Sequence, residues 1–169
     1  QNFCRRCLKG LVPLQKWKIT LLNCREIKMT HAHPMLAPVI ALAIWSAIIW
    51  FWMYATRIPA ILKARMALDS AAPRGSQMEL LPAAVRWKAD NFNHLMEHPT
   101  VFYAVAISLA VLGDATTTSV YLAWGYVAVR VIHSLVQVLT NHIQTRFALF
   151  VLSSLVLFGL TFRAAMLVF

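Results

Sequence analysis

One uncharged stretch constrains this chain more than any other feature of its sequence. Residues 35–56 contain no Asp, Glu, Lys or Arg and are mostly apolar. A helix of roughly 20 apolar residues spans the hydrocarbon core of a bilayer. The whole chain is 60% hydrophobic and 13% charged, whereas soluble domains carry about 25% charged residues. We therefore expect an integral membrane protein rather than a water-soluble enzyme.

Three further apolar stretches follow, at about 96–113, 117–140 and 147–169. Backbone polar groups in lipid need partners within a helix or a closed barrel. These stretches lack the period-two alternation of barrel strands, so they predict helices. We expect an all-α, integral membrane four-helix bundle over residues 29–169. Short connections on either side of the third stretch make the last three spans antiparallel neighbours.

The chain has a formal net charge of +10, and the location of its sixteen Lys and Arg residues decides what this charge means. Seven of them fall in residues 1–28, and six more in the polar link 57–95. Because cytoplasmic loops are enriched in basic residues, we expect this link in the cytoplasm and both termini outside. Charged residues are scarce in the rest of the chain, which excludes a nucleic-acid-binding arm. No nucleic-acid partner is therefore expected.

The first 28 residues fit the membrane domain poorly. Their positive charge opposes the orientation that the other loops favour. Their apolar stretch is interrupted by Lys16 and Lys18, and no small-residue cleavage site follows, unlike in a signal peptide. We expect residues 1–28 to be a separate basic head, either disordered or not native to the protein, with the natural start at Met29 or Met35.

All three cysteines lie in this head. The spacing Cys4-x-x-Cys7 is compatible with a metal or redox pair. A structural zinc site needs about four ligands, and no second ligand pair accompanies these cysteines. We therefore expect no metal site.

The third stretch carries polar side chains at a depth where they are costly. They are Arg130, His133, Gln137 and Asn141, and helical geometry places them within roughly 80° of one another. A charge near the bilayer centre costs about 2.5–3.5 kcal/mol on insertion scales. The stripe is therefore expected to face protein or a wet cavity.

A second polar stripe leads from the link into the second stretch. Its members, within roughly 60° of one another on a helix, are Arg86, Asp90, Asn93 and Glu97. Arg146 lies at the same expected level, at the start of the fourth stretch. We expect these groups to meet in a pocket at the cytoplasmic boundary. Several basic groups with one carboxylate suit a small molecule that has two carboxylates and one ammonium.

A purely structural alternative stays open at this stage. Glu97 and Arg130 could form an internal ion pair that only registers the helices, with His133 as a hydrogen-bonded core residue. The aromatic residues of the first and third stretches are typical of interfacial anchors, and they are not read as a cofactor site.

At these positions the sequence resembles the MAPEG family, the membrane-associated proteins of eicosanoid and glutathione metabolism. Arg130-x-x-His133-Ser134, followed by Asn141, Arg146 and Phe150, looks like the signature of the third and fourth helices. Arg86 to Asn93-x-x-x-Glu97-x-Pro99 is similar to the motif of the second helix. The resemblance covers about residues 35–169.

This resemblance implies a homotrimer of four-helix bundles that binds glutathione between adjacent subunits near the cytoplasmic boundary. It implies a glutathione transferase or peroxidase that acts on lipophilic small molecules. The chain resembles a divergent, prokaryotic member of the family, and its expected location is the bacterial inner membrane. Arg146 matches the arginine that stabilises the glutathione thiolate and is the expected catalytic residue. The expected glutathione-binding residues are Arg86, Asn93, Glu97, Arg130, His133, Gln137 and Asn141.

Three positions depart from the members that handle eicosanoids. Gln137 and Phe150 stand where such members carry tyrosines, and Phe147 stands where prostaglandin E synthase-like members carry a serine. Eicosanoid synthesis is therefore not expected. Two other functions stay open, a non-catalytic lipid-binding or scaffold protein on the same bundle and a small transporter subunit.

Overall fold

The computed structural model describes residues 33–67, 69–73 and 75–169. The basic head 1–28 and its cysteines lie outside these residues, so the expectations about them stay predictions. The described elements are α3 (Leu36–Lys63), the short 3-10 helix η1 (Ser76–Leu80), α4 (Ala83–Glu97), α5 (Pro99–Val111), α6 (Thr117–Leu139) and α7 (Ile143–Val168).

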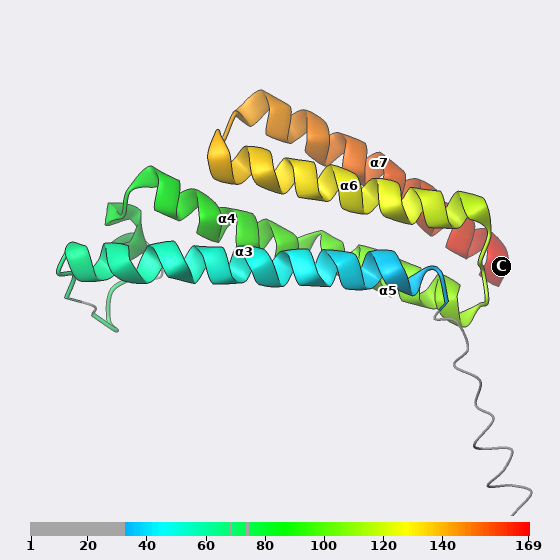
Figure 1. Cartoon of the computed structure of the whole chain (residues 1–169), viewed down its shortest axis with the longest axis horizontal. Coiled ribbons are helices and arrows are strands. Elements are labelled where there is room, and N and C mark those ends of the chain that lie inside the picture. Colours follow the sequence, from blue (N-terminus) through cyan, green and yellow to red (C-terminus); the bar gives the residue numbers. More distant parts are fainter. Residues whose placement is uncertain (1–32, 68, 74) are drawn as a thin grey trace, which may run out of the picture. The chain divides into compact units, whose positions relative to one another are not determined.

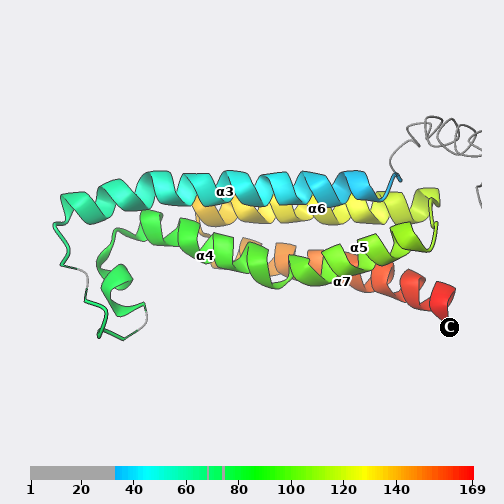
Figure 2. The same cartoon turned by 90° about the horizontal axis from the view of Figure 1, so that it is seen from below.

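The helices form a bundle of four rods, in which α4 and α5 are two parts of the second rod (Figures 1 and 2). In both views α3 runs along the α4–α5 rod. Helices α6 and α7 are antiparallel and lie side by side. The predicted fold class, an all-α membrane bundle, is confirmed.

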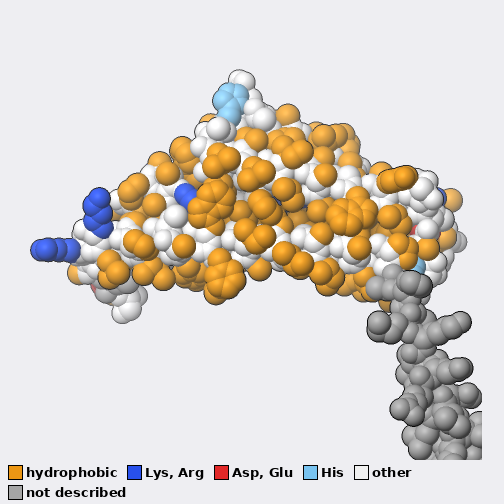
Figure 3. Space-filling model, viewed as in Figure 1, with side chains coloured by type: hydrophobic (Ala, Val, Ile, Leu, Met, Phe, Trp, Pro, Cys, Tyr) orange, Lys and Arg blue, Asp and Glu red, His pale blue; other side chains and the backbone are white. Residues whose placement is uncertain are grey.

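Three helices, α3, α6 and α7, are long and apolar enough to cross a membrane. Helices α4 and α5, with 15 and 13 residues, are each shorter than a span, and together they match the length of one. Apolar side chains cover the visible length of the bundle, and basic side chains gather at the end where α3 enters the link (Figure 3). This distribution is typical of a multi-pass membrane protein with one basic, aqueous end.

The second rod breaks at His98, between α4 and α5. Pro99 follows this residue and has no N–H to donate, and its ring crowds the carbonyl of the residue four positions earlier. At the first position of α5 the same proline is favourable, because the first N–H of a helix has no partner anyway. The second stretch, expected as one span over 96–113, is therefore divided: its first two residues end α4, and α5 covers Pro99–Val111.

Asn141 ends α6 in a left-handed conformation, with φ of +51°. Asparagine adopts this conformation more readily than most residues. The amides of Thr140 and Asn141 both donate to the Val136 carbonyl oxygen, at 3.1 and 2.8 Å. Helix α7 then begins at Ile143 rather than at the expected residue 147, so Arg146 lies in the first turn of a helix and not in a loop.

The opposite end of the bundle is held by Asp114, a buried residue of the α5–α6 loop. The Ser119 hydroxyl donates to Asp114 Oδ2 at 2.5 Å, and the Thr116 amide donates to Oδ1 at 3.1 Å. Arg163 of α7 lies with Nη2 3.7 Å from Oδ2. Burial alone would raise the pKa of Asp114, but the hydrogen bonds from Ser119 and Thr116, with the Arg163 charge, lower this pKa below its ordinary value.

Candidate functional site

The polar stripe of α6 lies inside the bundle. Arg130 and Gln137 have no exposed surface, and His133 is 3% exposed. Polar side chains of this size are buried at low cost only when they have partners. The expectation that the stripe faces protein rather than lipid agrees with this placement.

Arg130 is held by the end of a helix rather than by a carboxylate. Its Nη2 donates to the His94 carbonyl oxygen at 2.7 Å. That carbonyl belongs to the last turn of α4, next to the carbonyls that lack intrahelical donors. The C-terminal end of a helix also carries partial negative charge. Thus the C-terminal turn of α4 provides a partner for a buried cation.

Asn91 connects α4 to α6 close to this point. This side chain is fully buried, and its Nδ2 donates to the Ser134 hydroxyl oxygen at 2.6 Å. Its Oδ1 has no hydrogen-bond partner among the described residues. The contact fixes which face of α4 meets α6.

Gln137, Asn141 and Arg146 form a hydrogen-bonded group at the start of α7. Arg146 Nη1 donates to Asn141 Oδ1. Arg146 Nη2 and the backbone nitrogen of Asn91 both approach the Gln137 side chain, at 3.0 and 3.3 Å. Both of these neighbours are donors, so the Gln137 atom that faces them is its amide oxygen.

A cavity of ≈ 270 Å³ opens beside Arg146. Its polar side consists of His94, His133 and Arg146, and its apolar side of Ile143, Phe147 and Phe150. Phe147 is 67% exposed on the outer surface of α7. We call this the α7 cavity. It offers a cationic group next to a surface that is apolar enough to face lipid.

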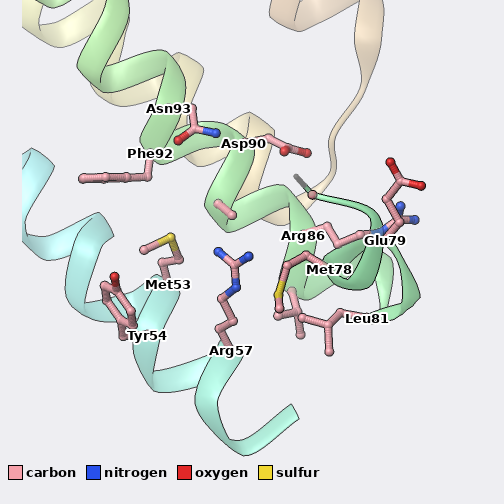
Figure 4. A pocket seen from close by; sticks show the side chains of 13 residues that line it. Met53, Tyr54, Arg57, Met78, Glu79, Leu81, Arg86, Asp90, Phe92 and Asn93 are labelled. Carbon is pink, nitrogen blue, oxygen red and sulfur yellow. The ribbon is translucent and has the colours of Figure 1, made fainter. Parts of the chain in front are cut away.

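A second cavity of ≈ 630 Å³ lies between α3, the link and the outer face of α4. We call it the link cavity. Figure 4 shows Arg57 extending from α3 toward α4, with Arg86, Asp90 and Asn93 on α4 around the same space. Glu79 of η1 also lines it. Its walls thus hold both signs of charge.

The two predicted stripes do not meet within one chain. Arg86 and Asn93 line the link cavity, whereas His133 and Arg146 line the α7 cavity. The physical reason is that one face of α4 cannot point both outward and toward α6. The Glu97 side chain is 72% exposed, with Oε2 4.0 Å from His94 Nδ1, and no ion pair between Glu97 and Arg130 occurs in the part of the chain that the structure describes.

The inner polar face of α4 is not among the predicted site residues. Asn91, His94 and His98 fall within roughly 60° of one another on a helix, centred about 100° from the stripe that contains Arg86. This spacing was available in the sequence as a second stripe. The stripe that contains Arg86 already makes this helix amphipathic, so the spacing does not identify a second polar face as the one that is buried.

His98, at the break in the second rod, links three helices. Its Nδ1 lies 3.1 Å from the Tyr126 hydroxyl of α6, and its Nε2 lies 3.3 Å from the Ser154 hydroxyl of α7. Ser154 also donates to the Phe150 carbonyl at 2.9 Å. The one hydroxyl proton of Ser154 is used in that bond. His98 Nε2–H therefore donates to the Ser154 oxygen, and the Tyr126 hydroxyl donates to His98 Nδ1. This chain of bonds is satisfied and fixes the helices around the break.

The basic groups of the site are oriented without being neutralised. Within residues 33–67, 69–73 and 75–169, no carboxylate oxygen lies within 4.0 Å of Arg130 or Arg146. In the same residues, Nε and Nη1 of Arg130 and Nε of Arg146 have no hydrogen-bond partner. Leaving a buried polar group unpaired costs about 1–3 kcal/mol. Of these two arginines, Arg146 lines the α7 cavity, where its charge suits an anionic or zwitterionic ligand, and Arg130 lines neither described cavity.

A model of the MAPEG family matches residues 35–166. The match covers most of the chain, including α3 to α6 and all but the last two residues of α7. The chain belongs to the MAPEG family. It is therefore a multi-pass MAPEG membrane protein, as the three membrane-length helices also indicate. No curated protein and no solved structure matches the chain significantly.

Proposed function

We propose that this MAPEG protein uses glutathione as a co-substrate and transfers it to lipophilic electrophiles, or reduces lipophilic peroxides, in a bacterial inner membrane. The observation that supports the proposal most is that the positive charge of Arg146 is not neutralised. Its guanidinium lies at the edge of the α7 cavity with no carboxylate within 4.0 Å among the described residues. A cation of this kind stabilises an anion beside it.

The chemistry follows from the effect of a cation on a thiol. A free thiol has a pKa near 8.5, and an adjacent positive charge lowers it. The glutathione thiol would then lose its proton to solvent and become a nucleophile. With chlorodinitrobenzene, the sulfur forms a bond to the ring carbon that bears chlorine, and chloride leaves with its electron pair.

The polar groups of the link cavity suit the rest of the tripeptide. Arg57 and Arg86 are complementary to carboxylates, and Asp90 is complementary to an ammonium. Asn93 supplies amide donors and acceptors at the same cavity. Glu97, on the exposed face of α4, is assigned to the ammonium of the ligand.

The two cavities lie on different faces of α4, which supports a site that is shared between chains. We propose that the protein assembles as a homotrimer, in which the outer face of α4 in one subunit lies against the α7 cavity of the next. Arg86, Asn93 and Glu97 would then come from one subunit. Arg146, with the α6 residues that support it, would come from its neighbour.

The test is ultraviolet absorbance of the thiolate and conjugate formation, measured on the purified protein with glutathione and chlorodinitrobenzene. The proposal predicts a thiolate band that saturates with glutathione and a rate above the uncatalysed one. Arg146→Ala should remove both while the assembly size stays unchanged. Absence of both signals in the wild-type protein would end the enzyme proposal.

A second function is favoured by Gln137, which has no acidic hydroxyl at a position where eicosanoid-handling members carry tyrosine. The α7 cavity is lined on one side by Ile143, Phe147 and Phe150, and such a surface suits an acyl chain. A non-catalytic lipid-binding protein would bind a fatty acid without affinity for glutathione. Calorimetric titration with each ligand separates the two functions.

A further inference from the structure

Arg146 is positioned by two amide oxygens, and this choice of partners has a chemical consequence. Gln137 Oε1 accepts from Arg146 Nη2 at 3.0 Å, and Asn141 Oδ1 accepts from Nη1. An amide oxygen orients a guanidinium as a carboxylate does, but it carries no formal charge. The positive charge of Arg146 is therefore fixed in place and left available.

We propose that Gln137 and Asn141 are positioning residues that aim Arg146 at an anion in the α7 cavity, rather than residues that bind glutathione. This inference rests on the proposed function, because it names what makes Arg146 able to stabilise the thiolate. Gln137 is fully buried, and it lines neither cavity. Its side-chain oxygen accepts from Arg146 Nη2 and from the backbone N–H of Asn91.

The backbone supports the same assignment for Asn141. Its left-handed conformation ends α6 and turns the chain into α7 within a few residues. The side chain is thereby held five residues before Arg146, within hydrogen-bond reach of it. The residue both closes the helix and provides the second acceptor.

The N-terminus of α7 adds to the positive electrostatic potential around Arg146. Arg146 lies in the first turns of a 26-residue helix, whose N-terminus carries partial positive charge. A cation in this place is unfavourable unless acceptors hold it. Once held, the guanidinium and the helix terminus act with the same sign on an anion in the α7 cavity, which Arg146 lines.

Two isosteric variants separate orientation from charge. Gln137→Glu keeps the acceptor and adds a negative charge, which neutralises Arg146. Gln137→Met keeps the volume and removes the acceptor. Asn141→Gly keeps the left-handed backbone at no cost and removes the whole side chain, including the oxygen that accepts from Arg146. Gln144→Glu, at an exposed position two residues before Arg146, adds the same charge without the contact and serves as the control.

The first measurement is the melting temperature of the detergent-solubilised full chain without glutathione, in a double-mutant cycle of Gln137→Met and Arg146→Met. Residues in direct contact give non-additive effects. We expect the double variant to deviate from the sum of the single variants by roughly 2 °C or more. Additive changes in melting temperature would overturn the contact between Gln137 and Arg146, whether or not glutathione binds.

The second measurement is the apparent pKa of the bound glutathione thiol, read from thiolate absorbance against pH. We expect Gln137→Glu to raise this pKa by about one unit or more, which corresponds to a tenfold loss of thiolate. Asn141→Gly should raise it by less, and Gln144→Glu should leave it unchanged. An unchanged thiol pKa in Gln137→Glu would overturn the inference, whereas absent glutathione binding in the wild type would overturn the proposed function instead.

Discussion

Glu97 illustrates how exposure separates a structural role from a ligand-binding role. Its side chain is 72% exposed, and its contact with His94 is 4.0 Å long. Changes at such positions usually alter stability by less than about 0.5 kcal/mol. If Glu97 faces the ligand ammonium, its charge matters only when glutathione is bound.

We therefore expect Glu97→Gln to leave the melting temperature unchanged and to weaken glutathione binding about tenfold, since a hydrogen bond to a charged group contributes about 1.5–3 kcal/mol. Calorimetric titration and thermal unfolding measure the two effects. Asp69→Asn, in the exposed part of the link, removes the same charge and should change neither. A large drop in melting temperature for Glu97→Gln would show a structural ion pair.

Asp114 predicts a pH dependence of stability. Its pKa is lowered in the folded protein: burial opposes the shift, and the hydrogen bonds from Ser119 and Thr116 outweigh it. An unfolded aspartate has a pKa of about 3.9. The stability that Asp114 contributes is thus fully present above about pH 4 and is lost as the pH falls through the folded-state value.

Asp114→Asn should therefore destabilise the protein by about 1–3 kcal/mol at neutral pH. The difference between variant and wild type should shrink as the solution becomes acidic. Melting temperatures of both proteins between about pH 3 and pH 7 test this. A difference that is the same at every pH would contradict the assigned role of the carboxylate.

At the scale of secondary structure, the break between α4 and α5 organises the bundle. His98 contacts Tyr126 on α6 and Ser154 on α7 at this break. The Arg130 guanidinium caps the carbonyl of His94 one turn earlier. Removing one of these bonds should therefore loosen three helices together.

Tyr126→Phe removes the hydroxyl that donates to His98 Nδ1. Hydrogen bonds between membrane helices contribute about 0.6 kcal/mol on average and up to about 1.7 kcal/mol, and we expect a loss in this range. Unfolding of the detergent-solubilised protein measures it. Tyr121→Phe is the matched control on α6, because Tyr121 is 72% exposed. Equal losses in the two variants would exclude a specific role for the His98 contact.

The helices that cross the membrane could be predicted from apolar length alone. The stretch 117–140 corresponds to Thr117–Leu139, and the stretch 35–56 extends to Lys63 in the structure. The break at His98 was not predicted, although Pro99 was visible, because hydrophobicity continues through it. Composition identifies spans, but backbone hydrogen bonding decides where they break.

Which side chains contact one another was harder to predict than where the helices lie. The buried stripe of α6 followed from its spacing and from the cost of polar groups in lipid. Helix α4 has polar residues on two faces, and the spacing alone does not say which face contacts α6. The Asn91–Ser134 contact decides it, and contacts of this kind follow from packing rather than periodicity.

At the scale of the whole molecule, a shared site predicts complementation between inactive chains. Arg86→Ala and Arg146→Ala should each abolish thiolate formation. In a homotrimer with equal, random mixing, about one site in four combines an intact Arg86 with an intact Arg146 of its neighbour. Co-expressed variants should therefore regain about a quarter of the wild-type signal. No recovery in verified mixed trimers would mean that both arginines serve the same chain.

The most direct test of this account is whether glutathione protects the protein against heat. A ligand that binds only the native state stabilises it, by about 2.7 kcal/mol at one hundred times its dissociation constant. We predict that the melting temperature of the detergent-solubilised protein rises by several degrees with reduced glutathione, and that Arg86→Ala suppresses the rise. An unchanged melting temperature at saturating glutathione would contradict the account.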